Sequence, residues 1–519
     1  MQPTSTGINR RTFLAGIATA AVTSILAACG GSSTSTDTPA AATKASGAAG
    51  APTSASTTAP VIPGGIATTG SASTSAGNAP PQVKLKAVKL RIAQFGPADT
   101  AQATQKVMEG FKQIQPDVTV EVFPVQTPDW DGYAAKLLTQ IAGGDTPDII
   151  YLATEGLQLF AAKGITTSLD EYVMRDKEQL KEFFADVHPS LVESMMYDGH
   201  LYSLPEYFNC NNIIYSKGAF DKRGIPYPTE EWTQDDFANL MPKLTTQSGG
   251  KTTEYAFFWT NRLWAGALSW IFINGSNILS EEKFAGGDAL WSTFYPNDPA
   301  AKGRQGGTKW ANATANVPAN IEAVQFLADL TQKLKAAPTP VEADAFQAQV
   351  TTTFANKQLA MYLSGGNGAR TLNAAGVKPD EYGITFMPKW KSRRHHQGTL
   401  GYAMAAKSPN KDAAFELLKW RVQKETMSSN FKVTSSTRSR RSINQALYEG
   451  AYGIKGWKIF YDTIDKYPDT APIPQPPQAN QVQQIFTKYI GLAVTGDQPV
   501  QTAMDSMQKE LTDALAKPA

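Results

Sequence analysis

Three acidic residues that could act on a glycosidic bond, Asp145, Asp148 and Glu155, lie close together in the sequence. Glycoside hydrolysis needs two carboxyl groups that face each other across the bond to be broken. However, the chain has no nucleophile elbow, catalytic triad or metal-binding signature beside them. We therefore expect a binding protein and not an enzyme, and an exported hydrolase that acts on glycans is the alternative.

Aromatic residues offer a second kind of chemistry, because a flat ring covers the apolar C–H face of a sugar at little cost in side-chain entropy. The candidates are Trp130, Trp259, Trp264 and Tyr402. Each of these side chains, taken alone, is more often part of a hydrophobic core than a platform for a ligand. Trp264 is the one that we favour as a platform for a sugar ring.

A glycine-rich turn, residues 365–368, precedes a predicted helix and could present backbone N–H groups to a phosphate. Gly366 and Asn367 lie in this turn, and Arg370 follows it. A receptor for an anionic or phosphorylated sugar is therefore an alternative to a receptor for a neutral one.

Two basic segments could bind an anion, a metal or a partner: residues 393–396 (Arg-Arg-His-His) and residues 438–441 (Arg-Ser-Arg-Arg). Adjacent histidines on a loop do not share one face, and the ligand spacings of a zinc site are absent. We expect no metal and no cofactor. We interpret the first segment as a solvated loop and the second as a basic surface loop, with a contact to a partner or a lipid headgroup as the alternative.

The first 29 residues have the features of an export signal. Arg10 and Arg11 precede an apolar stretch that is too short to span a membrane comfortably, and the stretch ends in Leu-Ala-Ala-Cys at Cys29. The pattern predicts a cleaved, twin-arginine-like signal peptide over residues 1–29, with Cys29 lipidated. An ordinary secretory signal with a chance cysteine is the alternative.

Residues 30–82 consist almost entirely of Ser, Thr, Ala, Gly and Pro, which cannot bury enough apolar surface to fold. They predict a disordered tether, for which a glycosylated stalk is the alternative.

The remaining ~435 residues suit two domains. A net charge of +2 argues against a nucleic-acid partner. If Cys29 is lipidated, Cys210 is the only other cysteine and no disulfide forms within the chain.

Hydrophobic periodicity in the first part of this body alternates between the period of a strand and that of a helix. Strands separated by amphipathic helices predict an α/β fold with a parallel sheet, in which ligands bind at the carboxyl ends of the strands. The loops after Phe95, Phe123 and Leu152 are therefore candidate binding loops. The predicted strands are 89–95, 118–122, 148–152, 212–215 and 359–363, and the predicted helices are 103–114, 133–141, 231–240, 323–334 and 504–515.

Five landmarks in order, spread over residues 85–515, resemble the family 1 extracellular solute-binding proteins, which are the maltose-binding-type receptors of ABC importers. No single landmark is specific, but their order over this length is. The landmarks are Gly143 to Ile150 (Gly-Gly-Asp-Thr-Pro-Asp-Ile-Ile), Ile213 to Lys217, Ala360-Met361 ahead of the glycine turn, Tyr382 to Ile384 with Met387-Pro388, and Ser408 to Lys411.

The resemblance implies a two-lobed periplasmic-binding-protein-like fold with hinge segments and a ligand cleft between the lobes. The order of landmarks places the N-terminal lobe at residues 83–207 with 400–447 and the C-terminal lobe at residues 208–399 with 448–519. Chain crossings are expected near 207–211, 398–402 and 447–454. A ligand held by both lobes closes the hinge, since only the closed state makes both sets of contacts.

The resemblance also implies a carbohydrate ligand, a di- or oligosaccharide, and the permease subunits of an ABC transporter as partners. The expected location is the outer face of the cell membrane, with a lipid anchor at Cys29, as a monomer. An adhesin for a polymeric glycan is a further alternative.

Some family positions match this sequence only in part. Glu155 stands where maltose-type relatives have an acidic acceptor of sugar hydroxyls, and Asn209 replaces an acidic residue at the first hinge. Three stacking aromatics of these relatives are replaced by Leu152, Asn367 and Gln483. The resemblance therefore does not extend to the identity of the sugar.

Overall fold

The computed structural model describes residues 85–127, 129–429, 437–444 and 456–518. The export signal, Cys29, the segment 30–82 and the expected crossing near 447–454 lie outside these residues. What the sequence predicts for them stays a prediction.

Among the described residues, seven strands form the sheet of what we call the first lobe, in the order β15-β6-β14-β3-β1-β2, with β16 beside β14. The strands β1, β2 and β3 are parallel, as the sequence predicts. The later strand β14 is antiparallel to both of its neighbours β3 and β6, so the sheet is mixed. The bounds are β1 Val88–Phe95, β2 Val118–Val125, β3 Ile149–Ala153, β6 Leu204–Cys210, β14 His396–Met404, β15 Thr437–Arg438 and β16 Ala471–Pro472.

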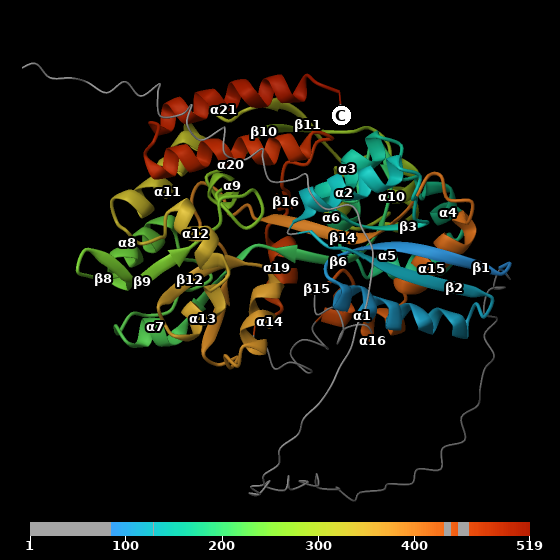
Figure 1. Cartoon of the computed structure of the whole chain (residues 1–519), viewed down its shortest axis with the longest axis horizontal. Coiled ribbons are helices and arrows are strands. Elements are labelled where there is room, and N and C mark those ends of the chain that lie inside the picture. The colour runs from blue at the N-terminus through green and yellow to red at the C-terminus, as the bar shows by residue number, and fades with distance from the viewer. Residues whose placement is uncertain (1–84, 128, 430–436, 445–455, 519) are drawn as a thin grey trace, which may run out of the picture. The chain divides into compact units, whose positions relative to one another are not determined.

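A second sheet of five strands, again counted over the described residues, forms the centre of the second lobe, in the order β13-β7-β12-β9-β8. In this sheet β12 is parallel to β9 and antiparallel to β7. Figure 1 shows the two sheets in different halves of the body. The bounds are β7 Asn212–Ser216, β8 Thr246–Ser248, β9 Lys251–Phe258, β12 Leu359–Ser364 and β13 Tyr382–Thr385.

Helices cover both sheets, and several of them begin at a side chain that caps the first turn. For example, α2 is capped by the carboxylate of Asp129, and a capping box formed by Thr233 and Asp236 begins α8. The first-lobe helices are α1 Ala98–Met108, α2 Trp130–Ala142, α3 Thr154–Ala162, α4 Asp170–Arg175, α5 Lys177–Ala185, α6 Pro189–Glu193, α15 Lys411–Arg421 and α16 Lys424–Ser429, with the 3-10 turn η1 at Glu109–Gln113.

The remaining helices cover the second sheet or join the lobes. Its hydrophobic cluster contains residues of α8, α9, α11, α20 and α21, and α20 packs along α21 and α11. These elements are α7 Lys217–Asp221, α8 Gln234–Leu244, α9 Leu268–Ile273, α11 Pro318–Gln332, α12 Pro340–Gln347, α13 Val350–Ala355, α14 Gly366–Ala374, α19 Ile459–Lys466, α20 Ala479–Thr495 and α21 Val500–Leu515.

The chain passes between the two sheets at Asn211, the single residue between β6 and β7. It returns between β13 and β14. These two crossings are joined by hydrogen bonds, because the N–H of Asn211 donates to His396 O (3.2 Å) and the N–H of His396 donates to Asn211 Oδ1 (3.0 Å). The two connections therefore move as one unit. The lobe boundaries that we expect from the sequence remain a prediction.

A further connection comes from the hairpin of β10 (Leu279–Lys283) and β11 (Thr308–Ala313). Leu279 and Trp310 of this hairpin belong to the second-lobe core. Residues 284–307 between the strands, which we call the arm, carry α10 (Asp288–Phe294) and the turn η2 (Pro299–Ala301).

The arm packs into the core of the first lobe, where Trp291, Phe294 and Tyr295 are buried. The rings of Phe184 and Phe294 lie 4.1 Å apart, and Tyr295 Oη donates to Val187 O (3.0 Å). Glu193, which is 4% exposed, accepts from Lys283, Arg304 and the N–H of Gln305 at 2.7–3.0 Å. At Gly306 an added Cβ would lie 2.4 Å from Gly199 Cα in the short hairpin of β4 (Met196–Tyr197) and β5 (His200–Leu201).

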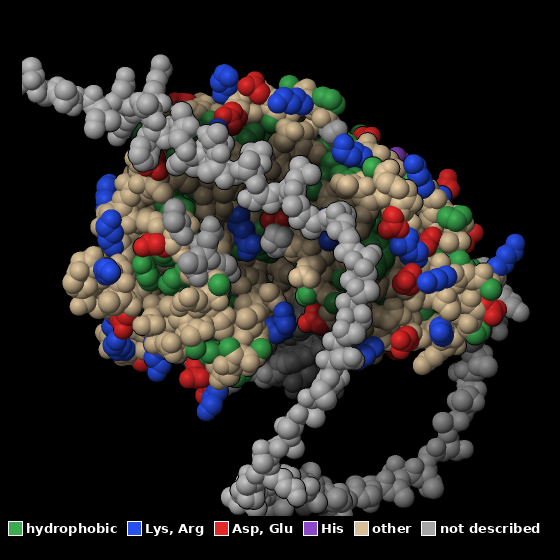
Figure 2. All heavy atoms as spheres, in the orientation of Figure 1, with side chains coloured by type: hydrophobic (Ala, Val, Ile, Leu, Met, Phe, Trp, Pro, Cys, Tyr) green, Lys and Arg blue, Asp and Glu red, His purple; other side chains and the backbone are tan. Residues whose placement is uncertain are grey.

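Charges of both signs are interspersed over the face shown in Figure 2. This distribution agrees with the net charge of +2. No described helix is long and apolar enough to cross a membrane.

Candidate functional site

A cavity of about 850 Å³ is lined by residues of both lobes. Its first-lobe wall begins where β1 ends, because Gly96 turns the chain with a φ of +116° and Pro97 precedes the first turn of α1. A residue with a Cβ rarely adopts this φ, so the turn requires glycine. The loop after Phe95, which we predict to be a binding loop, therefore lines this cavity.

Aromatic side chains continue this first-lobe wall. The ring of Trp130 stacks on that of Phe95, with centroids 4.4 Å apart and an interplanar angle of 20°. Trp130 also lies 5.7 Å from Tyr151, which in turn lies 4.8 Å from Tyr402. The partly exposed rings of Trp130 and Tyr151 face the cavity and offer the kind of surface that packs against the C–H face of a sugar.

On the second-lobe side, a tight loop after β9, residues 259–266, carries Trp264 and Arg262 into the cavity lining. Ala265 has a φ of +46°, which is unusual for a residue with a side chain. Its N–H donates to His396 Nε2 (2.9 Å), which fixes the loop to β14. At Gly266 an added Cβ would lie 2.1 Å from Arg262 O, so this position also requires glycine.

Trp264 lies directly over β14. Its ring meets that of His396 edge to face, with centroids 4.5 Å apart. A Cβ on Gly398 would lie 2.9 Å from Trp264 Cζ3. The glycine therefore makes room for the indole, and the partly exposed ring forms one wall of the cavity beside the crossing strands.

Two charged groups from opposite lobes, Arg262 in the cavity lining and Glu155 outside it, influence each other's pKa. Glu155 lies in the first turn of α3, where its Oε2 accepts from Thr154 Oγ1 (3.1 Å). Burial raises the pKa of Glu155, and Arg262 lowers it to a smaller extent. Desolvation by the cavity walls lowers the pKa of Arg262, although the residue itself is exposed, and Glu155 and Asp129 raise it. In α2 of the first lobe, burial and the neighbouring Asp129 raise the pKa of Asp131 to about 6.

The edge of the cavity between the lobes is polar. Asn209, near the end of β6, has a buried side-chain oxygen for which the described residues supply no hydrogen-bond partner. This oxygen lies 3.1 Å from the Cβ position of Gly365, the residue that precedes α14. Asn367 and Arg370 of α14 also line the cavity, and Arg370 donates to Asn367 Oδ1. Asn209 lines the cavity, and its side-chain oxygen is buried without a partner among the described residues.

The site contains no metal cluster within the part of the chain that the structure describes. No group of three or more His, Cys, Asp or Glu residues there is arranged to hold a metal ion. The side chains that line the cavity offer aromatic packing and hydrogen bonding by amide, carboxylate and guanidinium groups.

A sequence profile of the bacterial extracellular solute-binding proteins matches residues 97–427, which is more than half of the chain. The chain belongs to this family. The resemblance that we inferred from the order of landmarks is confirmed.

Curated relatives match this solute-binding protein over part of its length. A binding protein of Brucella abortus is 27% identical over 203 residues (37% of this chain and 46% of that protein). An uncharacterized lipoprotein of Streptomyces antibioticus is 26% identical over 149 residues (28% and 31%). The maltotriose-binding protein of Pyrococcus abyssi is 32% identical over 116 residues (22% and 23%). The aligned part thus spans about half the length, or less, of these relatives.

Solved structures match most of the body. The ABC substrate-binding protein Lmo0181 of Listeria monocytogenes, in complex with cycloalternan, has a TM-score of 0.67 at 20% identity and covers 82% of this chain and 98% of that one. Maltose-bound MalE3 of T. maritima has a TM-score of 0.62 at 19% identity, with coverage of 82% and 98%. The predicted two-lobed α/β fold is confirmed, and it is the fold of sugar ABC transporter substrate-binding proteins.

Seven of the nine ligand-binding residues that we expect from the sequence line the cavity of this solute-binding protein. The other two, Glu155 and Gly366, are not among the residues that line the cavity, and Gly366 instead packs against Trp457 and Thr437. The seven that line the cavity are Trp130, Asn209, Trp259, Trp264, Asn367, Arg370 and Tyr402.

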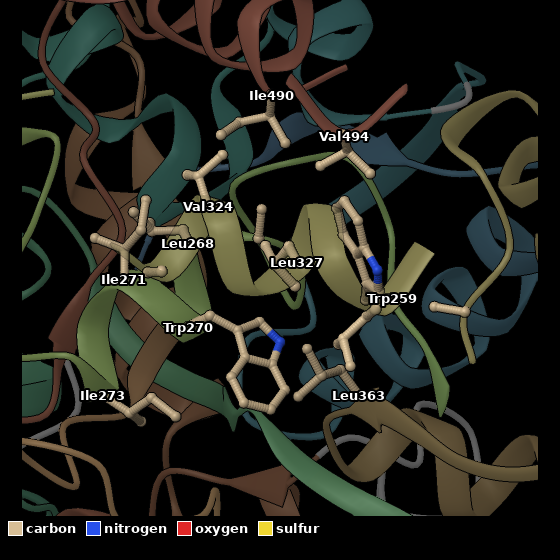
Figure 3. Packing of buried hydrophobic residues seen from close by; sticks show 14 of the residues in the cluster. Trp259, Leu268, Trp270, Ile271, Ile273, Val324, Leu327, Leu363, Ile490 and Val494 are labelled. Atoms are coloured by element: carbon tan, nitrogen blue, oxygen red, sulfur yellow. The ribbon is translucent and has the colours of Figure 1, made fainter. Parts of the chain in front are cut away.

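Two of these seven are mostly buried in the protein core. Trp259 is 3% exposed and belongs to the second-lobe cluster that Figure 3 shows around Leu363 and Val494. Tyr402 is also 3% exposed, and its hydroxyl donates to Gln94 Oε1 (2.7 Å). Their rings offer little surface to a ligand, so Trp130, Trp264 and Tyr151 are better placed to act as platforms.

Two interpretations of basic segments were wrong. His395 and His396 are fully buried, and Arg393 is 9% exposed, so residues 393–396 are not a solvated loop. His395 Nδ1 donates to Arg393 O (2.7 Å), and its Nε2 accepts from the N–H of Met387 (3.0 Å). Burial lowers the pKa of His395 to about 3.

The second basic segment is also largely internal. Arg438 and Arg440 are 1% and 2% exposed, because Arg440 pairs with Asp186 (2.9 Å) and Arg438 packs over the ring of Tyr207 (4.6 Å). Only Arg441 in this segment is well exposed. The arginines therefore stabilise the first lobe, and the interpretation as a basic surface loop does not hold.

Asp99 and Arg262 are the charged residues of the cavity lining that sequence reasoning missed, and Arg262 is the one on the second lobe. It lies between Trp259 and Trp264, two residues that we had singled out, and this position was the available signal. At Gln483, where the family resemblance implies a stacking aromatic, the side-chain Oε1 accepts from the N–H of Leu263 (3.2 Å). It thus holds the loop that carries Arg262 and Trp264.

Proposed function

We propose that this protein is the receptor of an ABC importer that binds a carbohydrate, a di- or oligosaccharide, between its lobes and delivers it to the permease. The observation that carries the proposal is a cavity of about 850 Å³ lined from both lobes by partly exposed tryptophans and by amide and guanidinium groups. Ligand sites of small molecules have this size and this mixture of apolar walls and a few polar groups.

The proposed mechanism couples binding to lobe closure. Trp130 and Tyr151 belong to the first lobe, whereas Trp264 and Arg262 belong to the second. A sugar that packs between them gains its full set of contacts only when the lobes are close together, so it shifts the population toward the closed state. The permease then recognises the loaded receptor by the shape of its two lobes.

We further propose that the chain is exported and held at the outer face of the membrane by a lipid on Cys29, with residues 30–82 as a tether. The Leu-Ala-Ala-Cys motif supports this placement, and so does the similarity to a Streptomyces lipoprotein. Mass spectrometry of protein from the membrane fraction tests it, since a Cys29→Ala variant should be released.

A thermal-shift screen tests the ligand. We expect at least one neutral di- or oligosaccharide to raise the melting temperature, because a ligand present at 100 times its dissociation constant stabilises the folded state by about 2.7 kcal/mol. Incubation with the same sugars tests the alternative of a hydrolase, since release of products would contradict a pure receptor. If only sugar phosphates or uronic acids stabilise the protein, the receptor is one for anionic sugars.

A further inference from the structure

His396 lies where the hinge meets the ligand cavity. It is the first residue of β14, directly after the chain returns from the second lobe, and its side chain is fully buried. Its backbone exchanges hydrogen bonds with Asn211 of the other crossing. Its imidazole contacts the loop 259–266 that carries Trp264 into the cavity lining. One residue thus contacts the hinge through its backbone and the ligand loop through its side chain.

The imidazole of His396 acts as a hydrogen-bond acceptor. The N–H of Ala265 donates to Nε2 (2.9 Å), and the hydroxyl of Ser269 lies 3.1 Å from the same atom. A backbone N–H can only donate, so Nε2 carries no proton and the ring proton is on Nδ1. Burial lowers the pKa of His396 well below its ordinary value, which keeps the ring neutral and Nε2 free to accept.

The other ring nitrogen of His396 indicates that the acceptor matters at this position. Nδ1 is buried, and the described residues offer it no acceptor. A buried N–H without a partner destabilises the fold, and an apolar side chain of similar size would avoid this loss. A histidine is therefore an advantage here through what its ring holds, which is the N–H of Ala265 and the edge of Trp264.

Trp264 lies between two anchors that belong to different lobes. On one side, the N–H of Leu263 donates to Gln483 Oε1 (3.2 Å) in α20 of the second lobe. On the other side, the N–H of Ala265 donates to His396, whose strand belongs to the first-lobe sheet. A rotation of one lobe against the other moves these two anchors relative to each other. The backbone of Trp264, the single residue between them, must follow this movement.

We propose that His396 is a positioning residue for the ligand platform: its Nε2 holds Ala265, so that the indole of Trp264 is set against the cavity and follows the hinge strand β14. The ring of His396 also supports the indole directly, edge to face at 4.5 Å. A displaced indole would pack less well against a sugar. The effect of His396 on sugar affinity rests on the proposed function, whereas its effect on the position of the indole does not.

The neighbouring His395 offers a matched comparison. It is also fully buried, and its Nε2 also accepts a backbone N–H, from Met387 (3.0 Å). His395 and Met387 are not among the described residues that line the cavity. Replacement of either histidine by asparagine removes a buried acceptor of the same kind, because the shorter amide does not reach the position of Nε2. Of the two changes, only the one at residue 396 releases the loop that carries Trp264.

The experiment compares His396→Asn, His395→Asn and His396→Gln in the purified protein. Glutamine is one carbon longer than asparagine, so its amide oxygen can replace Nε2 as the acceptor. Isothermal titration with maltose, maltotriose and maltotetraose measures the dissociation constants. Acrylamide quenching of tryptophan fluorescence, taken as the difference from the same variant with Trp264→Phe, measures the exposure of the Trp264 ring without any ligand. Melting temperatures without ligand measure the stability that each variant loses.

We expect the two asparagine variants to lose similar stability. For the sugar that binds the wild type most tightly, the dissociation constant should rise at least about fivefold in His396→Asn, but less than about twofold in His395→Asn and His396→Gln. Quenching of Trp264 should increase in His396→Asn and stay unchanged in the other two variants. With Trp264→Ala already present, His396→Asn should change the dissociation constant less than about twofold, because it acts through the indole. If His396→Asn does not fold, His396→Phe, which keeps a ring but no acceptor, takes its place with the same expectations.

Three results would overturn the inference while the proposed function stands. They are sugar binding by His396→Asn within twofold of the wild type, an equal loss of affinity in His395→Asn, and unchanged quenching of Trp264 in His396→Asn. If none of the three sugars binds the wild type, that result counts against the proposed function, and the quenching measurement alone decides the positioning role. Increased quenching in His396→Asn but not in His395→Asn then supports it, and equal quenching in the two refutes it.

Discussion

Replacement of Gly398 by alanine should weaken sugar binding by displacing Trp264. The added Cβ would lie 2.9 Å from Cζ3, 3.3 Å from Cη2 and 3.5 Å from Cε3 of the indole. A normal contact needs roughly 3.4 Å or more, so the ring must withdraw by ~0.5 Å from a well-packed position. An aromatic contact of good geometry is worth ~0.5–1.5 kcal/mol beyond its buried area. Loss of that amount raises the dissociation constant about 2- to 12-fold.

Isothermal titration with the saccharide that gives the largest thermal shift measures this effect. The decisive comparison is a double-mutant cycle with Trp264→Ala, because Gly398→Ala should have almost no further effect once the indole is gone. Gly143→Ala is the matched control, since a Cβ there meets nothing closer than 3.4 Å and the residue lies at the end of α2. The reasoning is refuted if Gly398→Ala weakens binding equally with and without Trp264.

Three further predictions concern stability and the loop. Glu206→Gln leaves Arg421 buried without its bidentate carboxylate partner (both contacts 2.6 Å). The free energy of unfolding measured by urea denaturation should fall by about 3–5 kcal/mol. A fall of less than about 1 kcal/mol would contradict this. Gln483→Leu removes the acceptor that holds the loop 259–266 and should weaken sugar binding about 2- to 10-fold. Gln483→Glu keeps an acceptor, so this variant should bind sugar like the wild type and have an unchanged melting temperature. Burial lowers the pKa values of His188 and His395 to about 3, so on acidification these residues take up protons in the unfolded chain before they do in the folded one. The free energy of unfolding should therefore fall as the pH drops below about 6.5, by up to ~2.7 kcal/mol per pH unit for the two residues together. A free energy of unfolding that stays constant between pH 7 and 5 would argue against this.

The alternation of strands and helices in the first lobe could be predicted because its signal is local. Buried apolar residues recur with the period of each element, and the predicted strand 89–95 is β1 (Val88–Phe95) within one residue. The pairing of β14 between β3 and β6 had no local signal, since its partners lie far away in the sequence. Register between distant strands is set by tertiary packing.

The candidate site could be predicted only in part, because the predicted binding loop after Leu152 supplies no residue to the cavity lining. The loop after Phe95 and the tryptophan at position 130 do line the cavity. The sequence did not show which charged residues are buried. His395 and Arg440 resemble solvated charges in the sequence, yet His395 is buried with a lowered pKa and Arg440 is buried and pairs with Asp186. A one-dimensional pattern of charged residues does not reveal a buried partner that lies far away in the chain.

The arm places a mechanical limit on the motion of the lobes. Its two ends, at Lys283 and Thr308, belong to a hairpin of the second lobe, while Trp291, Phe294 and Tyr295 are buried in the core of the first. Separation of the lobes must either expose these rings, at ~1.5–3 kcal/mol for each large apolar side chain, or bend the chain at the two strand ends. Both routes cost free energy, so the arm opposes separation of the lobes on this side.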